Sequence, residues 1–130
     1  MGQEYLIDTN VISHLFANRL PDAGAAFVKN IINTYFIISV AVKIKVLTYH
    51  EIPDKMSLIE DFVSLATILP LDKIVTKKAI DLRKYNKKMK LGDAIIAVTA
   101  LVHGLILITN NTKDFTHITD LVIIDPHTIA

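Results

Sequence analysis

The chain has 130 residues, 14 basic against 13 acidic side chains, a net charge of +1 and no cysteine. A hydrophobic fraction of 52% with 21% charged residues excludes intrinsic disorder, and the length predicts a single domain over residues 1–130. The lack of cysteine excludes a disulfide scaffold, a thiolate zinc site and a cysteine nucleophile. A chain so close to neutral has no general attraction for nucleic acid, so any such contact requires a local basic patch.

The start of the chain and one long uncharged run bear on where the protein resides. Glu4 stands where a secretory signal carries basic charge, and no long apolar region follows it, so we expect a cytoplasmic protein. The run from Ala94 to Thr112 holds no Asp, Glu, Lys or Arg and nearly reaches the length of a membrane span. Gly104 divides this run and polar residues end it. We therefore interpret it as a buried helix followed by a strand, and we expect no membrane partner.

Short apolar runs alternate along the chain with segments of helical periodicity. Pro21 interrupts the first helical pattern, and Asp22 and Ser39 are the expected N-caps of the next two helices. In the helix at 72–85, the side chains expected on the apolar side are Ile74, Val75, Ala79, Ile80 and Leu82. In chain order we expect a strand at 5–7, a helix at 11–16, a helix after Asp22, a strand at 35–38, helices at 40–50 and 56–66, an extended segment at 67–70, helices at 72–85 and 91–103, and strands at 105–108 and 121–124.

This alternation predicts the fold class. Strands that are apolar on both faces and alternate with helices are typical of a parallel sheet covered on both sides. Right-handed crossovers then give a three-layer α/β/α sandwich with a central parallel sheet. In such folds the functional crevice lies at the carboxyl ends of the strands. We therefore give most weight to polar residues that follow strands.

Three aspartates follow strands or open helices in this pattern. Asp8 ends the first strand, Asp93 opens the helix at 91–103, and Asp114 lies six residues after the strand at 105–108. Carboxylates that converge on one rim repel each other unless cations are present, and such oxygen ligands suit Mg²⁺ or Mn²⁺. Two such ions activate water and stabilise the leaving oxygen in phosphodiester hydrolysis. Each aspartate taken alone is also explained as a helix cap or a turn residue.

Three segments carry a resemblance to a known family. They are Leu6-Ile7-Asp8-Thr9-Asn10, Gly92-Asp93-Ala94-Ile95-Ile96-Ala97 and Leu107-Ile108-Thr109-Asn110-Asn111-Thr112-Lys113-Asp114-Phe115. Together, in this order and at this spacing, they resemble the PIN-domain family, and within it the VapC-type toxins of bacterial toxin–antitoxin pairs. The resemblance spans nearly the whole chain.

The resemblance implies an endoribonuclease that depends on Mg²⁺ or Mn²⁺ and has a PIN-like fold with a central parallel sheet. It implies that Asp8, Asp93 and Asp114 are catalytic and bind the metal. Asn10, Thr109 and Asn111 match polar positions that support the acids in relatives. It also implies an RNA substrate, a cognate antitoxin that wraps the toxin, and a homodimer.

One position departs from the family pattern. Relatives carry a glutamate on the helix after the second strand, in a motif like Ser-Val-x-x-x-x-Glu-Leu-Leu, and here Lys45 stands at that position, with Lys43 where some relatives have another acid. Side chains two residues apart on a helix differ by about 200° in direction, so only one of them faces the site. A charged lysine has no lone pair and cannot ligate a metal, but its ammonium can sit among the three aspartates. We hypothesise that the chain folds without metal, binds it poorly and cleaves RNA slowly. The alternative is a solvated Lys45, with Glu51 or another nearby acid serving the site.

Basic residues gather just before Asp93, where five of the eight positions from Arg83 to Lys90 are Lys or Arg. One interpretation is a solvated helix end that complements the helix dipole. The other is a rim that contacts RNA phosphates through Lys87 and Lys88. The five histidines lack metal-ligand spacing, and we interpret them as surface or core-edge residues.

Two classes of function therefore stay open. The first is an enzyme, a metal-dependent ribonuclease impaired at Lys45. The second is a PIN-like binding module that has lost its chemistry and contacts an antitoxin, RNA or another protein. A response-regulator-like receiver domain is disfavoured, because the sequence lacks both paired acids after the first strand and a central phospho-acceptor aspartate.

Overall fold

The structure is a computed structural model that describes residues 2–48 and 53–129. Helices and strands alternate in the expected order, with three single 3₁₀ turns between or after them (labelled η). The elements are β1 (Tyr5–Ile7), α1 (Thr9–Phe16), α2 (Asp22–Thr34), β2 (Ile37–Ser39), α3 (Val40–Thr48), η1 (Pro53–Lys55), α4 (Met56–Val63), β3 (Thr67–Leu69), α5 (Lys73–Tyr85), α6 (Leu91–His103), β4 (Ile106–Ile108), η2 (Thr112–Asp114), β5 (Ile123–Ile124) and η3 (Pro126–Thr128).

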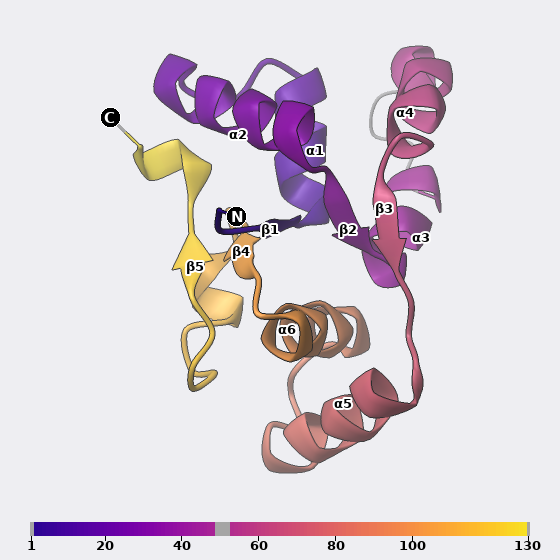
Figure 1. The fold of residues 1–130 in the computed structure, drawn as a ribbon, viewed down its shortest axis with the longest axis vertical. Helices are drawn as coiled ribbons and strands as arrows, with labels where there is room; N and C mark the ends of the chain where they lie inside the picture. The colour runs from indigo at the N-terminus through magenta and orange to yellow at the C-terminus, as the bar shows by residue number, and fades with distance from the viewer. Residues whose placement is uncertain (1, 49–52, 130) are drawn as a thin grey trace.

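The strands form a central parallel layer between helices. β4 pairs in parallel with both β1 and β5, and β2 pairs in parallel with β3. β1 and β2 lie in contact, so the two hydrogen-bonded sets continue each other. α1 and α2 lie on one side of this layer, whereas α6 contacts the strands from the other side and α5 packs on the outside of α6 (Figure 1). This arrangement confirms the predicted three-layer α/β/α sandwich with a central parallel sheet.

The core explains the unbroken apolar runs in the sequence. Leu6, Ile7, Ile38, Leu107 and Ile108 on three of the strands have no exposed surface. Strands covered on both faces cannot alternate apolar and polar residues, so their sequences read as continuous hydrophobic segments. In α6, residues 94–100 are all buried between the sheet and α5. No helix among residues 2–48 and 53–129 has the length and hydropathy of a membrane span.

Two of the expected helix starts can be compared with the structure. Ser39 caps α3 as predicted, because its hydroxyl oxygen accepts a hydrogen bond from the Val42 N–H at 3.2 Å. The prediction that Asp22 is an N-cap was wrong, since Pro21 occupies the cap position and Asp22 is the first helical residue. A carboxylate in the first turn still interacts favourably with the helix dipole, which explains its place in the sequence.

Other expectations need correction. Ile74 and Ile80 are 58% and 51% exposed, because α5 is an outer helix that turns only its narrow Val75–Ala79 side toward the core. The fourth helix ends at Val63 instead of residue 66. β1 has the predicted bounds, whereas the other strands are shorter than predicted. The last two residues of the helix predicted at 40–50 lie outside the described residues.

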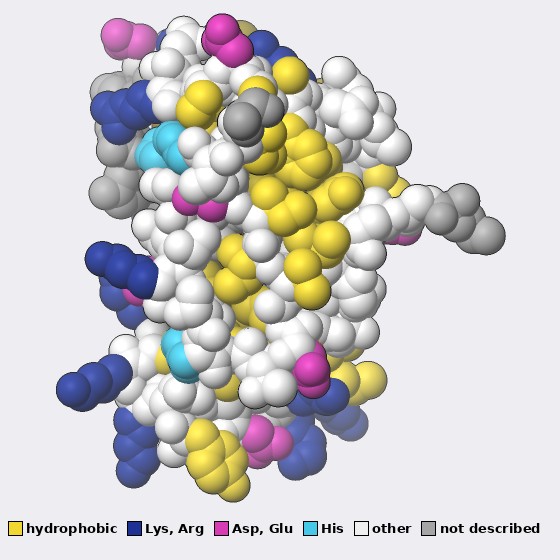
Figure 2. Space-filling model, turned by 90° about the vertical axis from the view of Figure 1, so that its left-hand side faces the viewer, with side chains coloured by type: hydrophobic (Ala, Val, Ile, Leu, Met, Phe, Trp, Pro, Cys, Tyr) yellow, Lys and Arg dark blue, Asp and Glu magenta, His cyan; other side chains and the backbone are white. Residues whose placement is uncertain are grey.

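β5 lies at one edge of the layer and leaves apolar surface uncovered. Val122, just before this strand, is 56% exposed, and Ile123 and Ile124 are partly exposed. Figure 2, which faces the side where β5 lies, shows apolar side chains gathered in the middle of this face and basic side chains projecting around its lower end. That lower end carries α5 and the loop that follows it (Figure 1).

Candidate active site

Asp8 is the most tightly held of the three predicted acids. It follows β1 directly, and the β1–β4 pairing continues through the hydrogen bond from its N–H to the Ile108 carbonyl at 2.9 Å. Its side chain caps α1 by accepting from the Thr9 N–H at 2.7 Å, so the predicted capping role is real. Its other oxygen accepts from the Thr109 hydroxyl at 2.8 Å. Only 4% of Asp8 is exposed, so a capping residue is at the same time a buried carboxylate.

A polar network around Asp8 contains all three residues expected to support the acids. Thr109 follows β4 and is fully buried. Its hydroxyl accepts from the Asn111 N–H at 3.1 Å and from the Asn10 amide at 3.5 Å, besides donating to Asp8. The Asn10 amide oxygen accepts from the Asn110 N–H at 3.0 Å. The turns after β1 and β4 are therefore locked to each other through side chains.

Burial acts on the pKa of Asp8 against its hydrogen bonds. Loss of hydration raises the pKa of this carboxyl, because the buried charged form is disfavoured. Hydrogen bonds from Thr109 and Thr9, and the positive charge of Lys45, act in the opposite direction, while the negative charge of Asp93 adds to the rise in pKa. The ionised form of Asp8 therefore has a desolvation cost that the hydrogen-bond donors and the Lys45 ammonium offset only in part.

Lys45 reaches into this site from α3. Its Nζ lies 3.7 Å from Asp93 Oδ1, with the Lys45 side chain 41% exposed and that of Asp93 14% exposed. Gly92 makes room for it, since a Cβ there would come within 2.7 Å of Lys45 Cε and 2.8 Å of Nζ. Lys43 is exposed, so of the two lysines it is Lys45 that faces the acids, in line with the expectation that only one of them can do so.

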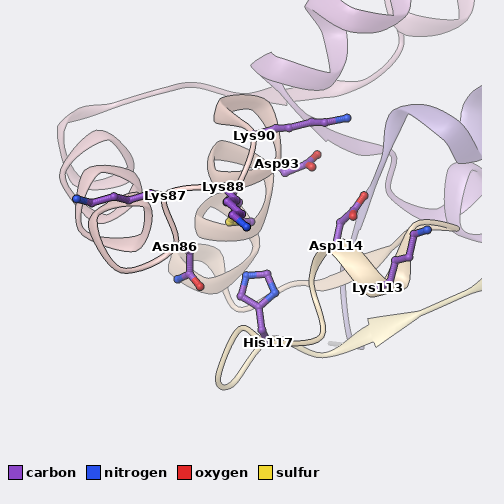
Figure 3. Close-up of a pocket in the computed structure, with 9 residues that line it drawn as sticks. Asn86, Lys87, Lys88, Lys90, Asp93, Lys113, Asp114 and His117 are labelled. Carbon is purple, nitrogen blue, oxygen red and sulfur yellow. The ribbon is translucent and has the colours of Figure 1, made fainter.

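Two neighbouring cavities meet at Asp93. The first, which we call the carboxylate cavity, has a volume of about 540 Å³, and its lining includes Asp8, Asn10, Ser13, Lys45, Asp93 and Asn111. The second, the basic cavity, has a volume of about 430 Å³, and its lining includes Asp93, Asp114, Asn86, His117 and four lysines, at positions 87, 88, 90 and 113. Asp114 in η2 is half-buried and extends toward the same space as Asp93 (Figure 3). The structure thus places Asp93 with each of the other two aspartates, but Asp8 and Asp114 line different cavities.

The described residues do not fit the divalent metal ion that the resemblance implies. Among residues 2–48 and 53–129, no three His, Asp or Glu side chains are placed so that they could hold one ion together. The ammonium of Lys45 instead provides the positive charge beside Asp93. A cationic donor at this position repels a metal ion and offers it no ligand. Glu51, the alternative acid, lies outside the described residues.

Sequence reasoning missed several features of the site. Ser13 and His14 on α1 line the carboxylate cavity, one turn after Asn10, where a helical projection from the Asp8 cap would have pointed to them. His14 Nδ1 also lies 2.7 Å from His127 Nε2, joining α1 to η3, and no sequence pattern links residues so far apart. His50 lies outside the part of the chain that the structure describes.

Comparisons with known proteins agree with the geometry. The sequence matches the PIN domain model over residues 5–121. It is 31% identical over 125 residues to Ribonuclease VapC1 of Rickettsia felis, covering 89% of this chain and 91% of that protein. The fold is similar to a toxin–antitoxin complex from Klebsiella pneumoniae (TM-score 0.76, 28% identity, 95% of this chain and 98% of that one). It is also similar to VapBC-1 from nontypeable Haemophilus influenzae (TM-score 0.77, 25% identity, 95% and 98%). The chain belongs to the PIN-domain family, and its relatives are of the VapC type.

Proposed function

We propose that this chain is an endoribonuclease of the VapC type, the toxin component of a toxin–antitoxin pair, whose cleavage of RNA is impaired by Lys45. The reaction is hydrolysis of a phosphodiester bond, in which Asp8, Asp93 and Asp114 would be the catalytic residues and would hold Mg²⁺ or Mn²⁺. The proposed impairment agrees with the finding that no three described acids are placed to share one ion. Asn10, Thr109 and Asn111 orient the acids. We further propose a cognate antitoxin, in line with the toxin–antitoxin complexes among the similar structures. A homodimer and a cytoplasmic location are proposed from the resemblance and the sequence alone.

The observation that carries the proposal is the contact between Lys45 and Asp93, with 3.7 Å between Nζ and Oδ1, beside the cavity that Asp8 lines. The hydrogen-bonded frame of Asp8, Thr109 and Asn10 is complete without Lys45. The acids and their supports therefore remain arranged for chemistry, while one side chain changes the charge of the site. With Lys45 in place of a carboxylate, the net charge of the four side chains is −2 instead of −4, which weakens the attraction for a divalent cation.

The decisive experiment compares three forms of the chain on a mixed RNA substrate in Mn²⁺. The parent carries Lys45, the Lys45→Glu variant supplies the family's carboxylate, and the matched control Lys45→Gln removes the positive charge without adding a ligand. We expect cleavage to rise at least about tenfold in Lys45→Glu and to stop when EDTA is added, because a fourth carboxylate attracts and ligates the metal. Lys45→Gln is expected to cleave no faster than a few times the parent rate.

The outcomes separate the possibilities. If parent and Lys45→Glu cleave equally well, another acid serves the site and the charge argument is wrong. If neither form cleaves any RNA offered, while both bind it, the second candidate function gains support.

That second candidate is a PIN-like binding module without catalysis. It is favoured by one observation, namely that the described acids form no group of three able to hold an ion. It predicts that the parent binds a partner or RNA with the same affinity with and without Mn²⁺, and that no substitution at position 45 restores cleavage.

A further inference from the structure

The basic cavity is separate from the carboxylate cavity and differs from it in charge. Its lining contains four lysines and two aspartates, so it carries a surplus of positive charge. In the carboxylate cavity, Lys45 is outnumbered by Asp8 and Asp93. Asp93 borders both, so a strand of nucleic acid that crosses Asp93 would lie in a negative cavity on one side and in a positive cavity on the other.

Within the basic cavity, the side chains of Lys88 and His117 point toward one another, and Asn86 lies beside them. Figure 3 shows Lys88, Asn86 and His117 grouped on one side of the cavity, with the carboxylates of Asp93 and Asp114 on the other. Lys87, in contrast, extends away from this group toward α5 (Figure 3) and also lines an apolar groove with Ile80. Of the two lysines that the sequence singled out, Lys88 therefore has the geometry of a contact inside the cavity.

The loop that carries Lys88 is fixed before any ligand arrives. The Met89 N–H donates to the Asn86 carbonyl at 3.0 Å, and the Asn86 amide donates to the Leu82 carbonyl at 3.1 Å. Arg83 Nε donates to the Met89 carbonyl at 3.2 Å, and the Met89 side chain is buried. Arg83 thus serves the loop itself, and the backbone on both sides of Lys88 is tied down.

His117 lies on a different loop and is held in a similar way. Phe115 has no exposed surface and Ile118 is 8% exposed, so buried anchors flank the histidine on both sides. The Ile118 N–H donates to the Phe115 carbonyl at 3.1 Å, which closes a tight turn around it. The exposed imidazole therefore projects from a fixed turn toward Lys88.

We infer that Lys88 and His117 form a phosphate-binding subsite for the RNA backbone, next to the acids Asp93 and Asp114, while Asn86 fixes the loop that carries Lys88. An ammonium and an imidazole N–H are both hydrogen-bond donors, and phosphate oxygens accept from each of them. The backbone of the two loops that carry these side chains is already fixed, so little conformational entropy is lost when a phosphate binds. This inference rests on the proposed function for its substrate class, but it does not depend on the residue at position 45, because the subsite holds RNA from the positive side.

The test measures binding of a fluorescein-labelled single-stranded RNA to the parent chain in EDTA, where cleavage does not interfere. The variants are Lys88→Gln and His117→Gln, and the matched control is Lys29→Gln on α2, at the opposite end of the molecule (Figure 1). We expect each cavity variant to weaken binding by about two- to fivefold, as for a screened charge contact. The slope of log affinity against log salt should become shallower by about 0.7 for Lys88→Gln, as for one lost phosphate contact on a single strand. Lys29→Gln should bind as the parent does.

A second readout identifies the ligand chemistry. Inorganic phosphate is titrated into the full chain while the ring signals of His117 are followed by NMR, and we expect them to shift in the parent and to shift less in Lys88→Gln. Unchanged RNA binding in both cavity variants, or ring signals that do not respond to phosphate, would overturn the subsite. Displacement of the RNA by a poly-glutamate peptide with no response to phosphate would also overturn it, in favour of an acidic protein partner. Failure here with active Lys45→Glu would leave the proposed function standing, since that variant is judged by cleavage.

Discussion

Replacing Lys45 should change stability in a way that reveals how the site balances its charges. Two unit charges 3.7 Å apart interact by about 1 kcal/mol in water and by about 4 to 5 kcal/mol at an effective dielectric constant of about 20. The Lys45 side chain is 41% exposed, so solvent screening reduces the pair to about 0.2–1 kcal/mol, the range of exposed ion pairs. Lys45→Gln loses that attraction alone. Lys45→Glu also adds repulsion from Asp93 and Asp8, so we expect a total loss of about 1–2 kcal/mol.

The assay is thermal unfolding of the parent, Lys45→Gln and Lys45→Glu, each in EDTA and in Mn²⁺. For a chain of this size, 1 kcal/mol corresponds to roughly 3–5 °C in Tm. In EDTA we therefore expect Lys45→Gln to melt about 2 °C below the parent and Lys45→Glu about 4–8 °C below it. Mn²⁺ should raise the Tm of Lys45→Glu strongly, since metal at a hundred times its Kd adds about 2.7 kcal/mol, and should leave the parent nearly unchanged.

Two results would refute this reasoning. If Lys45→Glu has the same Tm as the parent in EDTA, the charge at position 45 does not interact with the carboxylates, and the ammonium has no electrostatic role. If Mn²⁺ stabilises the parent as much as Lys45→Glu, the site binds metal despite the lysine.

Three further substitutions test other parts of the structure. Gly92→Ala pushes the flexible end of Lys45 away from Asp93 but gains helix propensity of up to about 1 kcal/mol, so thermal unfolding should show an unchanged or slightly raised Tm. A fall of several degrees would mean that the Lys45–Asp93 ion pair contributes more to stability than an exposed ion pair does. Asp8→Asn tests the raised pKa of Asp8, because its ionisation opposes folding above the unfolded value; urea unfolding should show the parent gaining stability relative to Asp8→Asn as pH falls through the raised pKa, and a difference that is the same at every pH would contradict this. Gly24→Ala should lower the free energy of unfolding by about 1–3 kcal/mol in urea unfolding, because the added Cβ would meet the Pro126 carbonyl oxygen. An unchanged denaturation midpoint would show that α2 and η3 separate easily.

Much of the fold could be predicted because local and global signals agree. Strands buried on both faces must be continuously apolar, and α6 lies between the sheet and α5, so its sequence is apolar almost all round. The errors fall where a signal is ambiguous. Ile74 and Ile80 satisfy the helical period but lie beside the buried stripe of an outer helix, and periodicity alone does not fix how wide that stripe is.

The candidate site could be predicted in part. The β1–β4 pairing brings Asp8 and Thr109 together, and strand-end reasoning with the family motif pointed to both. It did not reveal that Asp8 and Asp114 line different cavities, because that depends on how η2 and the 86–90 loop fold back toward Asp93. Nor did sequence reasoning assign His117 to the site, because two buried side chains in a turn set its position and no sequence motif marks such a turn.

The hydroxyl of Thr109 has a consequence for how such a protein evolves. It donates its one proton to Asp8 and accepts hydrogen bonds from the Asn10 amide and the Asn111 N–H. All its hydrogen bonds are therefore used, and none of them involves position 45. The hydrogen bonds of the frame therefore do not depend on which residue α3 presents there, although the charge at that position affects stability. In the genetic code a lysine codon and a glutamate codon differ by a single base in the first position. The ammonium and the carboxylate forms of this site are thus one point mutation apart on an unchanged scaffold, and selection can pass between them without a poorly folded intermediate.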